Sequence, residues 1–96
     1  MPAYVVAQYR RSPDYDSYRA AAAELNRKYD ARILTQSGTE QCIEGEWIAT
    51  AMVIIEFASL TRAREFLTSR AYEEVKALRR GAPPITIVVV DGAPGV

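Results

Sequence analysis

The chain has 96 residues, with 12 basic and 12 acidic side chains, one cysteine and no histidine. This length allows a single domain over residues 1–96, and a formal net charge of zero gives no overall field to attract nucleic acid or a membrane, so neither partner is expected. Without histidine the chain lacks the commonest metal ligand, and we expect no metal, haem or other cofactor. One cysteine cannot form an internal disulfide, and no segment resembles a signal peptide or membrane span, which predicts a cytoplasmic protein.

The first predicted elements are a strand and a helix. Residues 3–9, AYVVAQY, are β-branched and aromatic without a breaker, which predicts a strand. A helix over about residues 13–29 follows, because Ser12 can cap its start and Pro13 suits its first position. The helix carries a tyrosine-rich stripe, more typical of a core than of a ligand cage, formed by Tyr15, Tyr18, Ala22, Leu25 and Tyr29.

Two further strands are predicted in the middle of the chain. Residues 31–45 resume extended character, and Ser37 and Gly38 can form a bulge or kink within them. Gly45 begins a turn, and residues 50–57, TAMVIIEF, form the next strand.

The last third of the chain predicts a divided helix and a final strand. A short helical piece follows residue 59, and Ser69 then caps a second piece that ends near Arg79, where positive charge favours the helix dipole. Residues 81–84, GAPP, stop the helix. Residues 85–91, ITIVVVD, form the last strand, and residues 92–96 form a loose tail.

The predicted order of elements indicates an α+β fold. Two split βαβ units with right-handed crossovers give the ferredoxin-like βαββαβ sandwich, with a four-stranded antiparallel sheet and two helices on one face. Two of the strands, MVIIEF and ITIVVV, lack the alternation expected of a sheet with one wet face. We therefore expect both faces to be covered, the second by the sheet of another copy in a homodimer.

Several short motifs in order resemble a known family. The segments are AYVVAQY, YDARIL, IEGEW followed by VIIEF, and FLTSRAYEEVKALRR. Together they are similar to the domain of unknown function 1330 family, whose members belong to the dimeric α/β-barrel group. The resemblance implies the ferredoxin-like fold, a dimer whose two sheets form a barrel, and no established activity. Other members of the barrel group include cofactor-free monooxygenases, isomerases and haem-handling proteins, but fold kinship alone does not assign function.

Glu56 is a carboxylate inside an otherwise apolar strand. Because the predicted strands run antiparallel, Glu56 lies at the same sheet edge as Arg32, and a charge in such a strand is costly unless paired. The favoured interpretation is an ion pair that fixes strand register or the dimer contact. The alternative is a polar anchor or general base at a pocket mouth.

A second group of candidates lies on the divided helix. Ser69, Tyr72 and Arg79 match the serine, tyrosine and arginine pattern associated with the second helix of the family that the chain resembles. Tyr72 and Arg79 share a helix face, so both can point toward the cleft between helix and sheet and orient a small anionic or phenolic ligand. The alternative makes Tyr72 part of the core, Ser69 a cap and Arg79 a solvated partner of the dipole.

The segment before the third strand holds the remaining candidates. Trp47 can form a lid over a pocket or, as the favoured interpretation, a contact at the dimer rim. Glu44 and Glu46 are interpreted as solvated turn charges, and Cys42, on a predicted strand, as a small buried apolar residue.

Three functional classes follow. The leading hypothesis is a dimeric protein that binds a small, anionic or aromatic molecule between sheet and helices. The second is a cofactor-independent enzyme, an isomerase or monooxygenase, in which Glu56 or Tyr72 moves a proton while Arg32 or Arg79 holds an anionic substrate. The third is a structural or regulatory interaction module without a ligand.

Overall fold

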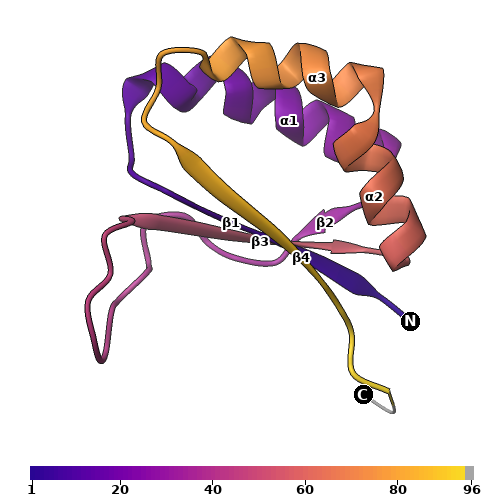
Figure 1. Cartoon of the computed structure of the whole chain (residues 1–96), viewed down its shortest axis with the longest axis horizontal. Helices are drawn as coiled ribbons and strands as arrows, with labels where there is room; N and C mark the ends of the chain where they lie inside the picture. Colours follow the sequence, from indigo (N-terminus) through magenta and orange to yellow (C-terminus); the bar gives the residue numbers. More distant parts are fainter. Residues whose placement is uncertain (95–96) are drawn as a thin grey trace.

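The computed structural model describes residues 1–94 and contains one antiparallel sheet with all helices on one face (Figure 1). The sheet order is β2-β3-β1-β4, and all three pairings are antiparallel. The elements are β1 (Ala3–Tyr9), η1 (Pro13–Tyr15), α1 (Asp16–Lys28), β2 (Arg32–Ile33), β3 (Ala51–Phe57), α2 (Leu60–Thr68), α3 (Arg70–Lys76), η2 (Ala77–Arg79) and β4 (Ile85–Asp91), where η1 and η2 are short 3-10 turns. The predicted ferredoxin-like α+β sandwich is confirmed.

Serine caps set the helix boundaries. The Ser12 hydroxyl accepts a hydrogen bond from the backbone N–H of Asp14 at 3.2 Å, and Pro13 follows it. Ser69 has extended backbone (φ −72°, ψ 153°) and accepts the N–H of Tyr72 at 3.0 Å. The second helix is therefore interrupted at Ser69 and continues as α3, as the sequence predicts.

The hydrophobic core lies between the helices and the sheet. Alternate residues of β1 are buried, beginning with Ala3 and ending with Tyr9, so one face of the strand packs under the helices. Tyr15 and Phe57 are almost completely buried, and each large apolar side chain removed from water in this way contributes about 1.5–3 kcal/mol. The tyrosine stripe of α1 thus belongs to the core, as expected.

The opposite side of the sheet, here called the outer face, is mostly aliphatic and aromatic and is not covered by helices in the single chain. Strand register places nine side chains on it: Tyr4, Val6, Gln8, Met52, Ile54, Glu56, Thr86, Val88 and Val90. Val88 is 54% exposed and Val90 is 49% exposed. The missing alternation in β3 and β4 therefore reflects apolar residues on both faces.

The predicted second strand over residues 31–45 is wrong in its length. β2 contains only Arg32–Ile33, and the chain then leaves the sheet edge. Gly38 adopts the left-handed φ of 92° at the departure, and side chains rather than backbone groups satisfy the next amides of β3. Residues 41–49, here called the arm, extend to the side of the sheet away from the helices (Figure 1). Cys42 consequently lies exposed on the arm and not buried on a strand.

The C-terminal end of the chain follows β4. β4 ends at Asp91, and the last two residues of the expected tail, 95–96, lie outside the described part of the chain. Within residues 1–94, no helix has the length and apolar character needed to cross a bilayer.

Candidate functional site

A cavity of about 500 Å³ opens between α1 and the sheet, next to the short strand β2. Its size falls in the usual range of small-molecule pockets, about 300–1,000 Å³. The inner wall is mostly apolar and comes from β1, β3, β4 and the inner face of α1: Ala7, Tyr9, Val53, Ile55, Ile85, Tyr18, Ala22, Ala23 and Asn26. Because β2 ends at Ile33, the edge of the sheet does not close this space.

Asn26 is the buried polar residue of the cavity wall. Its side chain lies on α1 and the residue is only 4% exposed, yet its Oδ1 atom has no hydrogen-bond partner within residues 1–94. A buried acceptor without a hydrogen bond costs about 1–3 kcal/mol, and buried polar groups in native proteins usually have a partner in the protein or in ordered water. Asn26 is therefore the candidate polar anchor in the wall of the cavity.

Two tyrosines and an arginine form a polar cluster behind the cavity. The hydroxyl groups of Tyr18 and Tyr72 lie 2.9 Å apart and share a hydrogen bond. The guanidinium of Arg79 lies 5.1 Å from the centre of the Tyr18 ring, and its Nε is buried without a partner in the described chain. Burial, reinforced by the hydrogen bond from Tyr72, raises the pKa of Tyr18 well above its ordinary value. Tyr18 is thus a neutral phenol at physiological pH and can donate a hydrogen bond.

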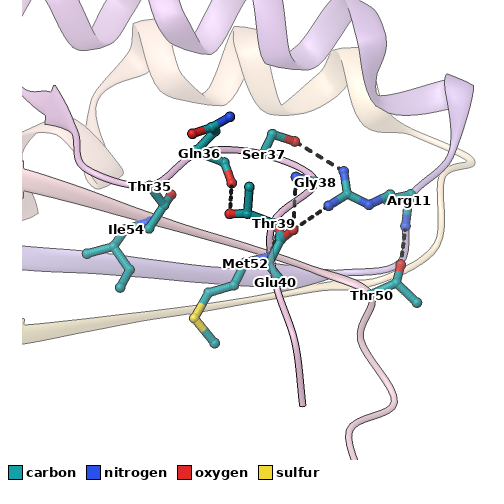
Figure 2. Close-up of polar contacts among 10 residues, drawn as sticks. All are labelled: Arg11, Thr35, Gln36, Ser37, Gly38, Thr39, Glu40, Thr50, Met52 and Ile54. Atoms are coloured by element: carbon teal, nitrogen blue, oxygen red, sulfur yellow. Dashed lines mark hydrogen bonds and ion pairs between the residues drawn. The ribbon is translucent and has the colours of Figure 1, made fainter. Parts of the chain in front are cut away.

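Side chains fasten the rim of the cavity to the edge of β3 (Figure 2). The Thr35 hydroxyl accepts the N–H of Ile54 at 3.2 Å, and the Glu40 carboxylate accepts the N–H of Met52 at 2.9 Å. The guanidinium of Arg11 donates to Glu40 at 2.6 Å and to the Ser37 hydroxyl at 3.1 Å. Thr35 and Ser37 also line the cavity, so these bonds hold its mouth in place.

Glu40 is the ionised centre of this rim. The backbone N–H of Met52 is the main cause that lowers the pKa of the Glu40 carboxyl below its ordinary value, and Arg11 adds a smaller effect. Glu40 therefore remains charged at neutral pH and keeps its three partners, Arg11, Met52 and the backbone N–H of Gly38.

Asp16 and Arg19 supply opposite charges at the other side of the mouth. Both side chains are exposed, and both line the cavity and the adjoining hollow of about 320 Å³ near η1. The cavity thus combines an apolar interior, one buried amide and a charged entrance, which is the usual composition of a site for a small organic molecule.

The predicted site residues divide between the two faces of the sheet. Tyr72 and Arg79 gather around Tyr18 on the helix side of the sheet, but neither of them lines the cavity. Arg32 and Glu56 form the predicted ion pair, with Nε and Oε1 3.3 Å apart, but Glu56 faces the outer face, opposite the cavity. The Arg32 side chain is 72% exposed and that of Glu56 28%.

Ser69 and Trp47 contact other parts of the structure. Ser69 serves α3 as its cap, and its hydroxyl also donates to the Phe66 carbonyl at 2.8 Å. The indole N–H of Trp47 donates to Gln8 Oε1 on the outer face at 3.2 Å. Trp47 is thus placed beside the outer face and away from the cavity mouth.

Asn26 and Arg19 were not predicted from the sequence as site residues. Asn26 lies four residues after Ala22 and eight after Tyr18, so it falls on the apolar stripe of α1. A polar residue on that stripe is the feature of the sequence that could have indicated a site residue. Arg19 carries no comparable signal, because an arginine on a helix is ordinarily solvated.

Comparison with solved structures shows the same fold in proteins of low sequence identity. A protein of unknown function from Rhodopseudomonas palustris has a TM-score of 0.74 at 15% identity, covering 96% of this chain and 82% of that one. A dimeric protein of unknown function and ferredoxin-like fold from Bacteroides fragilis has a TM-score of 0.60 at 13% identity, covering 95% of each chain. Hydroxynitrile lyase from Passiflora edulis has a TM-score of 0.68 at 14% identity, covering 99% of this chain and 95% of that one.

These similarities establish the fold and leave the activity open. No curated protein matches the chain. Residues 2–93 match the family described as Domain of unknown function (DUF1330). The match includes every strand and helix of the structure. The chain therefore belongs to the DUF1330 family.

Proposed function

We propose that the protein binds a small organic molecule in the cavity between α1 and the sheet. The observation that carries this proposal is Asn26, a buried residue whose Oδ1 atom has no partner within residues 1–94, in the wall of an apolar cavity of about 500 Å³. A ligand with an aromatic or aliphatic body fills the apolar interior, and a hydroxyl, amide or carboxyl group on it hydrogen-bonds to the Asn26 amide. Arg19 at the mouth provides a positive partner for an anionic end of the same ligand.

The working unit in this proposal is a homodimer joined through the outer face. Apolar side chains such as Val88 and Val90 are about half exposed there, and a single chain has nothing to cover them. The Bacteroides fragilis protein of the same fold is dimeric. The free thiol of Cys42 suits a reducing compartment such as the cytoplasm.

Cofactor-independent catalysis is a second candidate, and the Tyr18 and Tyr72 pair is the observation that favours it. Two phenols at 2.9 Å, one of them on the cavity wall, can donate a hydrogen bond to an oxygen that gains charge during a reaction. The raised pKa of Tyr18 makes it a hydrogen-bond donor and not a base at neutral pH. Glu56 faces away from the cavity, so within one subunit it is the weaker candidate for proton transfer.

A thermal-shift screen of aromatic and aliphatic acids, each paired with its amide and alcohol, tests the binding proposal. We expect at least one compound to raise the melting temperature of the wild-type protein, and Asn26→Leu to abolish that shift. Ser17→Leu, an exposed position on the same helix, is the matched control and should retain it. If no member of the screen shifts the wild-type protein, or if Asn26→Leu binds as well as the control, the proposed site is wrong. Turnover of a confirmed ligand, lost in Tyr18→Phe, would identify the protein as an enzyme.

A further inference from the structure

The arm carries the most exposed large apolar side chains in the described part of the chain. Ile43 is 86% exposed and Ile48 is 75% exposed. Both lie on the segment that extends from the sheet on the side away from the helices (Figure 1). Two isoleucines left in water on one projecting segment indicate a surface that another protein covers.

Hydrogen bonds hold the arm against the end of the sheet. At its base the N–H of Thr50 donates to the Tyr9 carbonyl at 3.0 Å, and farther out Trp47 donates to Gln8. Near its tip the Cys42 thiol lies 3.3 Å from the carbonyl oxygen of Gly45. The arm therefore projects in a defined direction.

The arm and the outer face enclose a groove of about 390 Å³. Gln8 and Met52 of the outer face form one side of it, and the arm, including Ile43 and Trp47, forms the other. The groove also contains Glu40, Glu44 and Glu46. Because Gln8 and Met52 belong both to the groove and to the outer face, one partner can cover both surfaces.

The outer face is too small to form a standard dimer interface without further contacts. Strand register places nine side chains on it. A standard interface buries about 800 Å² of accessible surface on each partner and uses about 20–30 residues there. The arm is the apolar segment that continues the face on the same side, so it can supply the further contacts.

We infer that the arm is a dimer clasp: each arm extends along the sheet of the second copy, where Ile43 and Ile48 contact the partner. In a two-fold dimer the contact occurs twice, because each subunit supplies one arm to the other. The inference rests on the homodimer of the proposed function and adds the residues that hold it together.

Sedimentation velocity over a dilution series tests the clasp. The double variant Ile43→Ser/Ile48→Ser should raise the dimer dissociation constant at least about tenfold, because each subunit loses two buried isoleucines. Leu78→Ser, which removes a 49% exposed leucine on the helix side, is the matched control and should change the constant less than about twofold. Circular dichroism establishes that both variants are folded.

Photo-cross-linking provides a second readout without altering the isoleucines. Cys42 is the only cysteine, so a benzophenone maleimide attached to it places the probe on the arm. Illumination should give a covalent dimer, and the same probe on Leu78→Cys/Cys42→Ser should not. A wild-type protein that sediments as a monomer would refute the homodimer itself. The clasp alone would be refuted if the wild-type protein is a dimer, the double variant has the same dissociation constant, and the probe on Cys42 gives no cross-link.

Discussion

Replacing Asn26 by leucine separates the requirements of folding from those of binding. Leucine has the same branched side-chain shape as asparagine, with two methyl groups in place of the oxygen and the amide nitrogen, so the substitution removes the unpartnered Oδ1 from the core. An unsatisfied buried acceptor costs about 1–3 kcal/mol. The higher helix propensity of leucine adds about 0.5 kcal/mol. We therefore expect Asn26→Leu to stabilise the unliganded protein by about 1.5–3.5 kcal/mol while it abolishes ligand binding.

Urea and thermal unfolding at fixed protein concentration measure this effect. For a domain of this size, 1 kcal/mol corresponds to about 4–8 °C in the melting temperature. Ser17→Leu reports the gain that helix propensity alone provides, and the difference between the two variants isolates the buried amide. If Asn26→Leu is less stable than the wild-type protein by 1 kcal/mol or more, the amide supports the fold and the reasoning fails.

Three further substitutions test the polar contacts. Tyr18→Phe leaves the Tyr72 hydroxyl buried without its partner and should lower the free energy of unfolding in urea by about 1–3 kcal/mol. The double variant Tyr18→Phe/Tyr72→Phe should lose less than the sum of the two single variants, because it leaves no unpaired hydroxyl. Arg32→Ala should lower the free energy of unfolding by less than about 1 kcal/mol, because the Arg32 side chain is mostly exposed. A larger loss that increases as the protein is diluted would instead place the Arg32–Glu56 pair in a dimer interface. Because the pKa of Glu40 is lowered, its stabilising effect is complete above the ordinary glutamate value of 4.5 and is lost as the pH falls through the lowered pKa. The free energy of unfolding should therefore fall less steeply with acid in Glu40→Gln than in the wild-type protein. Equal slopes for the two proteins would contradict this.

The fold was predictable because its signals are local and agree with one another. Serine caps at Ser12 and Ser69, apolar periodicity in α1 and β-branched runs in β3 and β4 each point to the observed element. The pairing of Arg32 with Glu56 followed from antiparallel geometry and one charge in an apolar strand. Local pattern and strand order together were enough for these features.

The length of the second strand was not predictable in the same way. Residues 34–45 have extended character in sequence, but their amide partners on β3 are satisfied by the side chains of Thr35 and Glu40. These contacts join residues that are 12 and 19 positions apart, and they produce no periodic pattern in the sequence from which they could be predicted. The cavity depends on this early departure from the sheet, so its position could not be read from the strand pattern. Asn26 was visible only as a polar residue on an apolar stripe, and its missing partner is a property of the folded chain.

The fastening of the cavity rim by side chains has a consequence for how this scaffold can diversify. A rim built as a regular strand would change register over its whole length if one residue were inserted. Here the rim is attached at separate points, through Thr35 at one end and Glu40 at the other, and the residues between them bear no ladder bonds to β3. The length and identity of residues 36–39 can therefore change, at the cost of the Ser37 contact to Arg11, while the sheet, the core and the outer face stay as they are. Relatives with the same sheet can thus differ in the shape of the cavity entrance by a few residues.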